Sequence, residues 1–418
     1  MVSGIEYKTR RYTFRETGKN TDRSIHLQRR LENFPHKRNG SWKMKQSPGT
    51  LTERLKADLP LTLEPPVIRK TNYISSGFVL NCGFARTNGG RFWASFGARE
   101  DGPRSSLVIA YSDDEGGTWN DQVFELDGGD TPNGFHLTNR VGALWNDPVG
   151  RLHLFFIQTL DYFDGRSGTW ESHCDNPDDP DPEWSEPVRL WHATPLNKPC
   201  VCRNGDWLLP VSLSIRRHMR FGGEQPEASL FAELDPIRGA NVIASRNHGR
   251  SWEWRGFQRS TDPLFDEHHI LERQDGTLRM YARDSFGIVS ADSNDNGYHW
   301  TPFKREFFTT SARFSVTKLP SGNWLMVRYD CPDKDVRKNL TAYISTDEGR
   351  NWSGGLLLDD REKISYPDAF VHPDGRIFVQ YDHLRQNGSL VMAVFREEDA
   401  LAGKNVSGQV RLKLETLR

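Results

Sequence analysis

The sequence predicts an all-β protein in which one sheet-forming unit is repeated around a closed array. The first observation is a pattern that occurs four times: Ser, any residue, Asp or Asn, any residue, Gly, two more residues and Trp. Its copies are Ser112–Trp119, Ser245–Trp252, Ser293–Trp300 and Ser345–Trp352. The Ser and the Asp or Asn favour a side-chain-to-backbone turn, the Gly permits a tight reversal, and the Trp is a large apolar side chain to bury beneath it. Self-similarity over tens of residues is typical of a radial or stacked array.

The second observation is a set of glycine-containing hairpin tips, each followed by strand-like sequence. The tips are Asn88–Gly90, Asp147–Gly150, Asn204–Gly205, Asp275–Gly276, Ser321–Gly322 and Asp374–Gly375. Four of them lead to a copy of the Trp turn, and the second leads to a degenerate stretch, Asp175–Trp184. Six tips predict six sheets, with seven sheets as the alternative.

The two ends of the chain are expected to behave differently. The last sheet needs a strand from elsewhere, either the tail Gln409–Leu417 or a segment near Pro66–Lys70, and Glu397–Gly403 is expected to form a helix before the tail. Such closure removes free sheet edges. Residues 1–60 are rich in Arg, Lys and Asn with little periodicity, so we expect a partly irregular N-terminal extension, followed by the sheet array over residues 61–418.

The Trp turn resembles the Asp-box, or BNR repeat, of the sialidase superfamily. The resemblance extends over roughly residues 65–415. It implies a six-bladed β-propeller with Asp-box repeats (alternative: seven blades), in which each box is a folding element that joins the outer two strands of a blade. It also implies a site on the propeller axis. We expect neither a metal nor another cofactor there.

The resemblance assigns roles to five residues. Sialidases use a Tyr paired with a Glu as nucleophile, and Tyr366 matches this Tyr, with Glu267 as its partner, because a phenol needs a carboxylate to accept its proton. Arg283 and Arg337 match arginines that bind the substrate carboxylate, since a guanidinium fork pairs with a carboxylate through two parallel hydrogen bonds. Asp101, on the loop before the first box, matches the acid and base.

The first blade departs from the family pattern. Sialidases begin it with Phe/Tyr-Arg-Ile-Pro, whereas Gly77–Arg86 contains neither that Arg nor the Pro. Arg99 lies nearby and is kept as a candidate substrate-binding residue. Basic residues stand at equivalent positions before other tips and are expected near the axis: His136 as a catalytic candidate, and Lys198 and His268 as substrate-binding candidates.

Composition excludes several classes of partner. The chain has 55 Lys and Arg against 56 Asp and Glu, a formal net charge of -1, whereas nucleic-acid and anionic-membrane partners normally demand a basic excess. No apolar run is long enough to span a bilayer. Cys200 and Cys202, two residues apart, are read as core residues in preference to a metal pair. The first residues do not resemble a secretory signal, so the protein is intracellular or has lost a leader, and we leave its compartment open.

We expect an exo-acting glycoside hydrolase that cleaves a terminal, carboxylate-bearing sugar from a glycan. The close alternative is a propeller polysaccharide lyase acting at a uronic acid, for example rhamnosyl-glucuronate, in which His136 or Tyr366 removes the C5 proton. The alternative from another class is a non-catalytic Asp-box propeller that only binds. The sugar, the linkage and the oligomeric state are not predicted.

Overall fold

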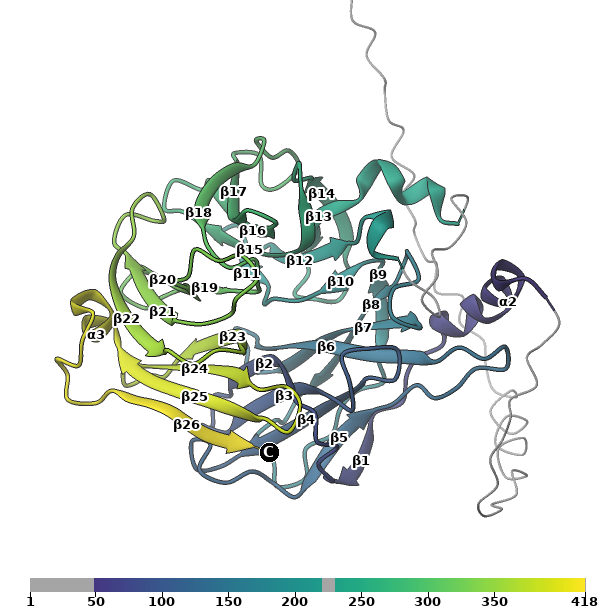
Figure 1. Cartoon of the computed structure of the whole chain (residues 1–418), viewed down its shortest axis with the longest axis horizontal. Coiled ribbons are helices and arrows are strands. Elements are labelled where there is room, and N and C mark those ends of the chain that lie inside the picture. Colours follow the sequence, from purple (N-terminus) through teal and green to yellow (C-terminus); the bar gives the residue numbers. More distant parts are fainter. Residues whose placement is uncertain (1–48, 220–229, 418) are drawn as a thin grey trace, which may run out of the picture. The chain divides into compact units, whose positions relative to one another are not determined.

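A computed structural model describes residues 49–219 and 230–417, and within these ranges the chain forms six antiparallel sheets arranged as a β-propeller (Figure 1). The six-bladed architecture expected from the hairpin tips is therefore confirmed. Most of the expected N-terminal extension lies outside the described residues. Its described part forms helix α2 (Leu51–Asp58), which begins at a capping box made by Thr50 and Glu53, and the 3-10 helix η1 (Leu59–Leu63).

The first three blades follow one another around the ring (Figure 1). Blade 1 consists of β2 (Leu80–Arg86), β3 (Phe92–Ala98), β4 (Ser106–Ser112), β5 (Gln122–Leu126) and, at its outer edge, β1 (Arg69–Asn72). Blade 2 consists of β6 (Leu137–Asn146), β7 (Leu152–Leu160), β8 (Gly168–Cys174) and β9 (Val188–Trp191). Blade 3 consists of β10 (Thr194–Pro195), β11 (Cys200–Val201), β12 (Trp207–Leu213), β13 (Gly239–Ser245) and β14 (Glu253–Gln258), with 3-10 helices η2 (Arg216–His218) and η3 (Ala232–Ile237) between β12 and β13.

The last three blades each have four strands. Blade 4 consists of β15 (Pro263–Glu272), β16 (Leu278–Asp284), β17 (Gly287–Ser293) and β18 (Lys304–Phe308). Blade 5 consists of β19 (Ser315–Lys318), β20 (Trp324–Tyr329), β21 (Leu340–Ser345) and β22 (Ser353–Asp359). Blade 6 consists of β23 (Ile364–Val371), β24 (Arg376–His383), β25 (Ser389–Arg396) and β26 (Arg411–Leu417), with helix α3 (Glu397–Ala402) before β26.

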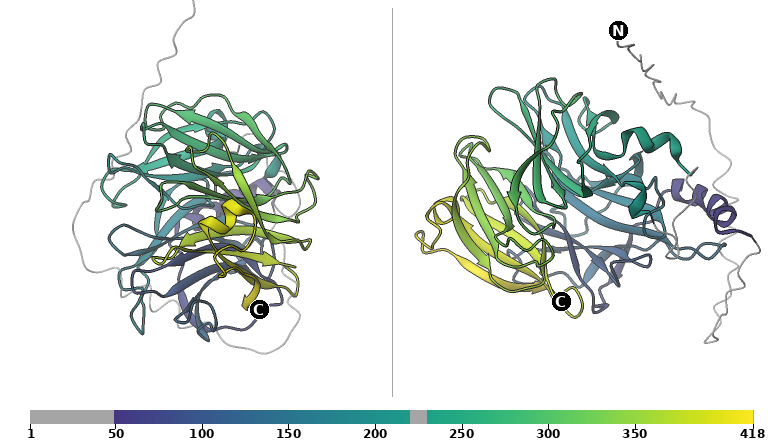
Figure 2. Two further views of the ribbon diagram at one scale, coloured as in Figure 1. Left: turned by 90° about the vertical axis from the view of Figure 1, so that its left-hand side faces the viewer. Right: turned by 45° about the horizontal axis from the view of Figure 1, so that its top comes forward.

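The C-terminal tail completes the last blade. β26 pairs with β25, whereas β1, which overlaps the other candidate segment, pairs with β5 in blade 1. The expected helix is α3, and it ends at Gly403 in the left-handed conformation. Apolar side chains of blades 1 and 6 form one buried cluster, which includes Phe92, Phe378 and Leu417. Figure 2 shows the C-terminal end beside the strands of the first blade. This packing closes the ring.

The four repeated turns join the third and outer strands of blades 1, 3, 4 and 5, as expected. In the first turn Ser112 Oγ accepts from the backbone N–H of Gly116 (2.9 Å), and Asp114 Oδ1 accepts from the N–H of Thr118 (2.7 Å). The degenerate stretch of blade 2 is built differently, because Asp178 accepts from the N–H of Gly89 in the tip of blade 1 (2.9 Å). The repeated turns thus hold the edges of their own blades, and the degenerate stretch ties blade 2 to blade 1.

Polar side chains also tie the inner strands to one another across the axis. The buried guanidinium of Arg313 donates to the carbonyl oxygens of Cys82 (2.9 Å) and Leu196 (2.6 Å) and to Asn197 Oδ1 (3.1 Å from Nε). Asn197 Nδ2 in turn donates to the carbonyl oxygen of Glu267 (3.0 Å). These hydrogen bonds therefore connect blades 1, 3, 4 and 5 to one another at the backbone of Glu267.

Candidate functional site

A cavity of about 140 Å³ is lined by residues from all six blades. Its polar lining comes from the starts of first strands and from the connections between second and third strands, which lie opposite the hairpin tips. The charged or phenolic side chains in the lining are Asp101, Arg140, Tyr162, Glu267, Arg283, Arg337, Tyr366 and Arg385. The cavity therefore brings together Tyr366, Glu267, Arg283, Arg337 and Asp101, which the sequence analysis had assigned to one site.

A continuous hydrogen-bonded chain runs through Tyr366, Glu267 and Arg283. The Tyr366 hydroxyl donates to Glu267 Oε1 at 2.7 Å, and Arg283 Nη1 donates to Glu267 Oε2 at 2.8 Å. Glu267 and Arg283 are buried, whereas Tyr366 is partly exposed to the cavity. Arg283 Nε also donates to Ser311 Oγ at 3.3 Å, which fixes the direction of the guanidinium. A buried carboxylate with one oxygen on a phenol and the other on an arginine is placed to accept the phenolic proton.

The backbone is in the left-handed conformation at Tyr366 and at Glu267. Phe265, Asp266 and Glu267 have φ of 59°, 52° and 42°, and Tyr366 has φ of 53°. The registers of β15 and β23 shift at the same places, so each strand bulges where it carries the side chain. Left-handed non-glycine residues cost about 1–3 kcal/mol each and cluster at functional sites. The left-handed backbone thus directs Glu267 and Tyr366 toward the cavity and lowers the stability of the fold.

Two more guanidiniums meet at Ser365, next to Tyr366. Arg337 Nη1 and Arg385 Nη2 both donate to Ser365 Oγ, the latter at 2.9 Å. Arg385 also pairs with Asp101 (2.8 Å) and with Asp382 (3.4 Å). Among the described residues no carboxylate lies within ion-pair distance of Arg337. This half-buried guanidinium therefore faces the cavity without a carboxylate in direct contact, although its charge also acts on the buried Asp382.

Asp101 lies at the edge of the cavity and holds three contacts there. Its Oδ1 accepts from the Tyr162 hydroxyl at 3.0 Å and lies 3.6 Å from Arg140 Nη1, and its Oδ2 accepts from Arg385 Nη1 at 2.8 Å. The side chain is 36% exposed, so it can reach a ligand at the cavity mouth. Arg140 lies over the ring of Tyr162 at 3.8 Å, which holds both side chains against the loop of Asp101.

The electrostatics of the cavity favour a protonated phenol at rest. Burial, followed by the charge of Glu267, raises the pKa of Tyr366, although Arg385 and Arg283 oppose this. Burial works against the charge of Arg283, but Glu267 more than offsets it and the pKa of Arg283 is raised. Tyr366 is therefore neutral at pH 7, and it becomes a nucleophile only while Glu267 removes its proton.

Comparison with known proteins assigns the family. A family model described as "BNR repeat-like domain" matches residues 87–379, which is more than half of the chain. The chain belongs to this family. The repeated turns are therefore BNR repeats, as the sequence indicated. No curated protein matches the sequence.

Solved structures with the same fold include sialidases and an arabinanase. A Hadza microbial sialidase has a TM-score of 0.59 at 16% identity, over 77% of this chain and 66% of its own. A leech intramolecular trans-sialidase has a TM-score of 0.59 at 13% identity, over 81% of this chain and 71% of its own. An α-L-arabinanase of Penicillium chrysogenum has a TM-score of 0.52 at 13% identity, over 81% of this chain and 99% of its own. The BNR propeller is thus glycoside-hydrolase-like in fold, and these identities carry no information on its substrate.

Two of the expected substrate-binding residues point away from the cavity. The Lys198 ammonium donates to Asp368 Oδ1 (2.9 Å) and to the carbonyl oxygens of Phe84 and Ala369 (2.7 Å each), where it lines a separate hollow among the inner strands. The ring of His268 is buried, with Nε2 at 2.8 Å from the carbonyl oxygen of Asn241 in blade 3. Successive side chains of a strand point to opposite faces. An alignment of the repeats that is wrong by one residue therefore places a side chain on the wrong face of its strand.

His136 and Arg99 lie next to the Asp101 loop and outside the cavity lining. Arg99 pairs with Glu125 (3.0 Å) and Asp127 (2.8 Å). His136 is buried, with Nδ1 at 2.9 Å from Asp130 Oδ1 and Nε2 at 3.4 Å from Asp127 Oδ1. The latter contact is an ion pair that lacks good hydrogen-bond alignment. Neither side chain is placed to touch a ligand inside the cavity.

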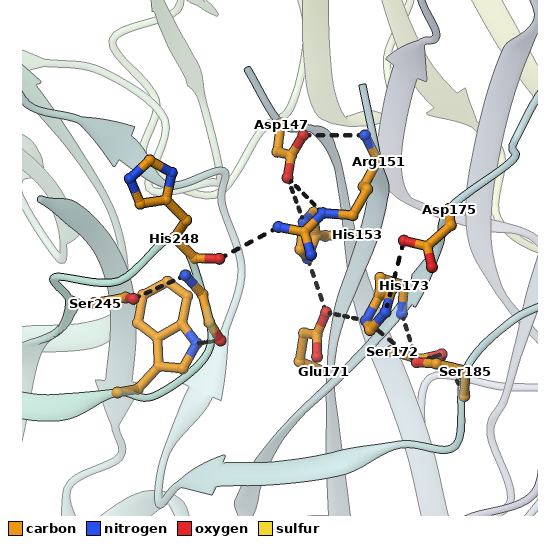
Figure 3. Close-up of polar contacts among 12 residues, drawn as sticks. Asp147, Arg151, His153, Glu171, Ser172, His173, Asp175, Ser185, Ser245 and His248 are labelled. Atoms are coloured by element: carbon orange, nitrogen blue, oxygen red, sulfur yellow. Dashed lines mark hydrogen bonds and ion pairs between the residues drawn. The ribbon is translucent and has the colours of Figure 1, made fainter. Parts of the chain in front are cut away.

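A further polar cluster, shown in Figure 3, braces blade 2, which lacks an Asp-box. The buried ring of His153 lies between Glu171 (Nδ1 to Oε1, 2.8 Å) and Asp147 (Nε2 to Oδ2, 3.1 Å). Arg151 donates to the same Asp147 and to the carbonyl oxygen of His248 in the box of blade 3. The cluster thus connects blades 2 and 3 on the side of the hairpin tips. It shares no residue with the cavity.

The sequence analysis missed Arg385, Arg140 and the apolar wall of the cavity. Phe163 and Phe265 stack at 5.6 Å between ring centroids and line one side. A signal for Arg385 existed in the repeat, because it stands between the second and third strands of its blade, as Asp101 and Arg337 do in theirs. Within the described ranges no group of three or more His, Cys, Asp or Glu side chains is arranged to hold a metal ion, and no helix is long and apolar enough to cross a membrane.

Proposed function

We propose that this BNR propeller is an exo-acting, retaining glycosidase that hydrolyses a terminal sugar bearing a carboxylate. The observation that carries the proposal is the chain Tyr366–Glu267–Arg283, which opens on a cavity that also holds Arg337 without a carboxylate partner. A nucleophile paired with a base supports covalent catalysis, and an unpaired guanidinium beside it supports an anionic substrate.

The reaction follows from the roles of these groups. The substrate carboxylate binds between Arg337 and Arg385, which Ser365 holds side by side. Glu267 accepts the Tyr366 proton as the phenolic oxygen attacks the anomeric carbon, and Asp101 donates a proton to the departing glycosidic oxygen. The glycosyl–tyrosine bond is then cleaved by a water molecule that Asp101 deprotonates, with the phenolic proton returned from Glu267. Two displacements at one carbon retain its configuration.

The apolar lining of the cavity supports binding of a sugar. Phe163 and Phe265 offer an apolar face for a sugar ring in the same cavity as the arginines. Arg283 has a different role in this proposal from the carboxylate binding that the resemblance implied. Because one of its nitrogens binds Glu267, it orients the base and contributes to the carboxylate site only with the rest of its fork.

The lyase alternative loses one of its supports. It relied on His136 as a base, and His136 does not line the cavity. A lyase with Tyr366 as the base remains as an alternative outcome of the experiment, as does a propeller that only binds.

The test is a panel of sialosides, uronides and rhamnosyl-glucuronic acid glycans with the masses of all products recorded. Hydrolysis adds one water across the cleaved bond, whereas elimination adds none and produces an unsaturated, ultraviolet-absorbing sugar. Tyr366→Phe removes the nucleophilic oxygen and is expected to lower kcat by at least about 10³-fold with an unchanged fold. The matched control is Tyr298→Phe, which removes an exposed hydroxyl that accepts from Arg246 outside the cavity lining and is expected to retain full activity. Full activity of Tyr366→Phe refutes the assignment.

A further inference from the structure

We infer that His136 is a positioning residue whose protonated ring holds the acid–base loop of this enzyme in place. The inference rests on the proposed function, in which Asp101 is the acid and base. The loop in question is Arg99–Arg104, the connection that carries Asp101 between β3 and β4.

Both flanks of this loop end in a basic residue that is held by an aspartate of the next connection. Before Asp101, Arg99 Nη1 lies 2.8 Å from Asp127 Oδ2. After Asp101, Arg104 Nη1 lies 3.2 Å from Asp130 Oδ1. Asp127 and Asp130 thus form two anchor points, one on each side of the candidate acid.

His136 bridges the two anchor points. Its Nδ1 faces Asp130 at 2.9 Å and its Nε2 faces Asp127 at 3.4 Å. An imidazole with a carboxylate oxygen beside each nitrogen has an N–H for both only when it is protonated, because the neutral ring carries one N–H and one lone pair. Loss of the proton would turn a lone pair toward one of the aspartates. That aspartate would lose a partner, and the flank that it holds would loosen.

The surroundings of the ring favour its charged form. The contact with Asp127 raises the pKa of His136, partial burial opposes this, and Asp130 adds to the rise. The other charged groups near the ring are Arg99 and Arg104 on the loop, together with Glu125 beside Arg99. Asp161, which directly follows β7, accepts from the backbone N–H of His136 at 3.2 Å.

The helix packed against this segment adds two more charged groups. Arg54 of α2 donates to the carbonyl oxygen of Asn133 (3.2 Å), and Asp58 accepts from Thr131 Oγ1 (2.6 Å). These contacts fix the connection of His136 to α2. The segment is therefore a fixed support, and the ring of His136 is its titratable contact with the loop.

The arrangement predicts that the loop is held at low pH and loosens as the pH rises through the titration of His136. A group whose pKa is raised in the folded protein contributes its stabilisation below that pKa and loses it above. A displacement of about 1 Å at a catalytic group costs up to about 10²-fold in rate. Because Arg337 is held by Ser365 and not by the loop, substrate binding depends on the loop less than proton transfer does, and the loss should appear mainly in kcat.

The decisive experiment compares backbone hydrogen exchange of the peptide that covers residues 99–105 in the wild-type chain and in His136→Gln, at matched pH values from about 5 to 9. The ratio of the two rates cancels the intrinsic effect of pH. We expect the variant to exchange about 5-fold or more faster at the acidic end, with the ratio falling to about one at the alkaline end, where the wild-type ring has lost its proton. A ratio of one throughout, or a raised ratio that does not vary with pH, overturns the inference.

Two variants keep the test interpretable. His153→Gln removes a ring that also lies buried between two carboxylates, and it should leave the exchange of residues 99–105 unchanged. Arg104→Gln breaks one flank at an exposed side chain and should speed exchange of the loop even if His136→Gln folds poorly.

The exchange readout does not depend on turnover. If the wild-type chain cleaves no acidic glycoside, the proposed function fails, and the exchange ratio still decides whether His136 holds the loop. If the chain is active, the alkaline fall of kcat should be present in the wild type and absent from His136→Gln. An identical pH profile of kcat in the two proteins contradicts the inference.

Discussion

Asp266 offers a quantitative test of the backbone turn that positions Glu267. Its side chain is buried, Oδ2 accepts from Ser212 Oγ at 2.7 Å, and Oδ1 has no hydrogen-bond partner. Burial, with the charge of Glu267 adding to it, raises the pKa of Asp266 from 3.8 to about 7. The folded protein therefore keeps this proton up to about pH 7, whereas the unfolded chain releases it near pH 4. Unfolding releases a proton between these values, so stability must fall as the pH rises through them.

The size of the effect follows from the interval. At about 1.4 kcal/mol per pH unit, the range from about pH 4.5 to about pH 7 corresponds to a loss of about 3 kcal/mol from this one group. Asp266→Asn removes the titration. The free energy of unfolding of the variant, measured by urea denaturation and compared with that of the wild type, should therefore improve by about 3 kcal/mol between about pH 4.5 and about pH 8.

Asp399→Asn is the matched control. Asp399 is also buried but accepts from the backbone N–H groups of Val406 and Ser407 and from Ser407 Oγ, and its pKa is lowered although burial opposes this. Because the pKa of Asp399 is lowered in the folded protein, its ionised side chain stabilises the fold fully at pH values above the unfolded pKa of 3.8. The cost of Asp399→Asn in free energy of unfolding should therefore stay constant over the same pH range. If the Asp266→Asn difference is also constant with pH, Asp266 is ionised in the folded protein and the reasoning is refuted.

Three further predictions concern the arginine site and the repeated turns. Arg337→Lys keeps the charge but loses the fork, and it should raise KM for an acidic substrate about 10-fold or more with little effect on a carboxyl-reduced analogue; equal effects on both would contradict a carboxylate site. Gly349→Ala, at φ 81° with the new Cβ 2.7 Å from the Trp324 ring, should lower the free energy of unfolding by about 3 kcal/mol or more. Gly322→Ala, at φ 91° with no atom within 4 Å of the new Cβ, should lower it by about 1–2 kcal/mol. Thermal denaturation of both variants measures the difference, and equal costs would rule out the packing argument. Asp114→Ala leaves the N–H of Thr118 without its acceptor at an exposed turn and should cost about 1 kcal/mol in urea unfolding, whereas a loss above about 3 kcal/mol would show that the first box supports more than its own turn.

The fold was predictable because its signals are local and repeated. Each Trp turn fixes the connection between two outer strands, and each glycine tip fixes the hairpin before it, so the six sheets and their order follow from short stretches of sequence. The completion of the last blade was left between two segments, since strand pairing across the whole length of the chain has no local signal. β26 supplies that strand, whereas β1 extends the first blade.

The candidate site was predictable only in part. Tyr366 and Glu267, 99 positions apart, do form a hydrogen bond, as the resemblance implied. His136 and Lys198 precede hairpin tips, which predicted that both lie near the axis. Lys198 does reach it, since it binds blades 1 and 6 from blade 3, but it lines a hollow other than the cavity. His136 lies outside the cavity lining, because the bulges and the pleat of the inner strands decide which face each side chain takes. Arg385 was missed although its place between the second and third strands of blade 6 matches those of Asp101 and Arg337, because the sequence does not show that these three loops lie side by side.

The central claim is that Tyr366 forms the bond to the sugar. The most direct measurement is peptide mass mapping after rapid acid quenching of the enzyme during turnover of an acidic glycoside that the substrate panel identifies. The account predicts a glycosyl mass increase on the peptide that contains Tyr366, absent from Tyr366→Phe, with overall retention of configuration. An adduct on Glu267 or Asp101, or no adduct together with inversion, would contradict it.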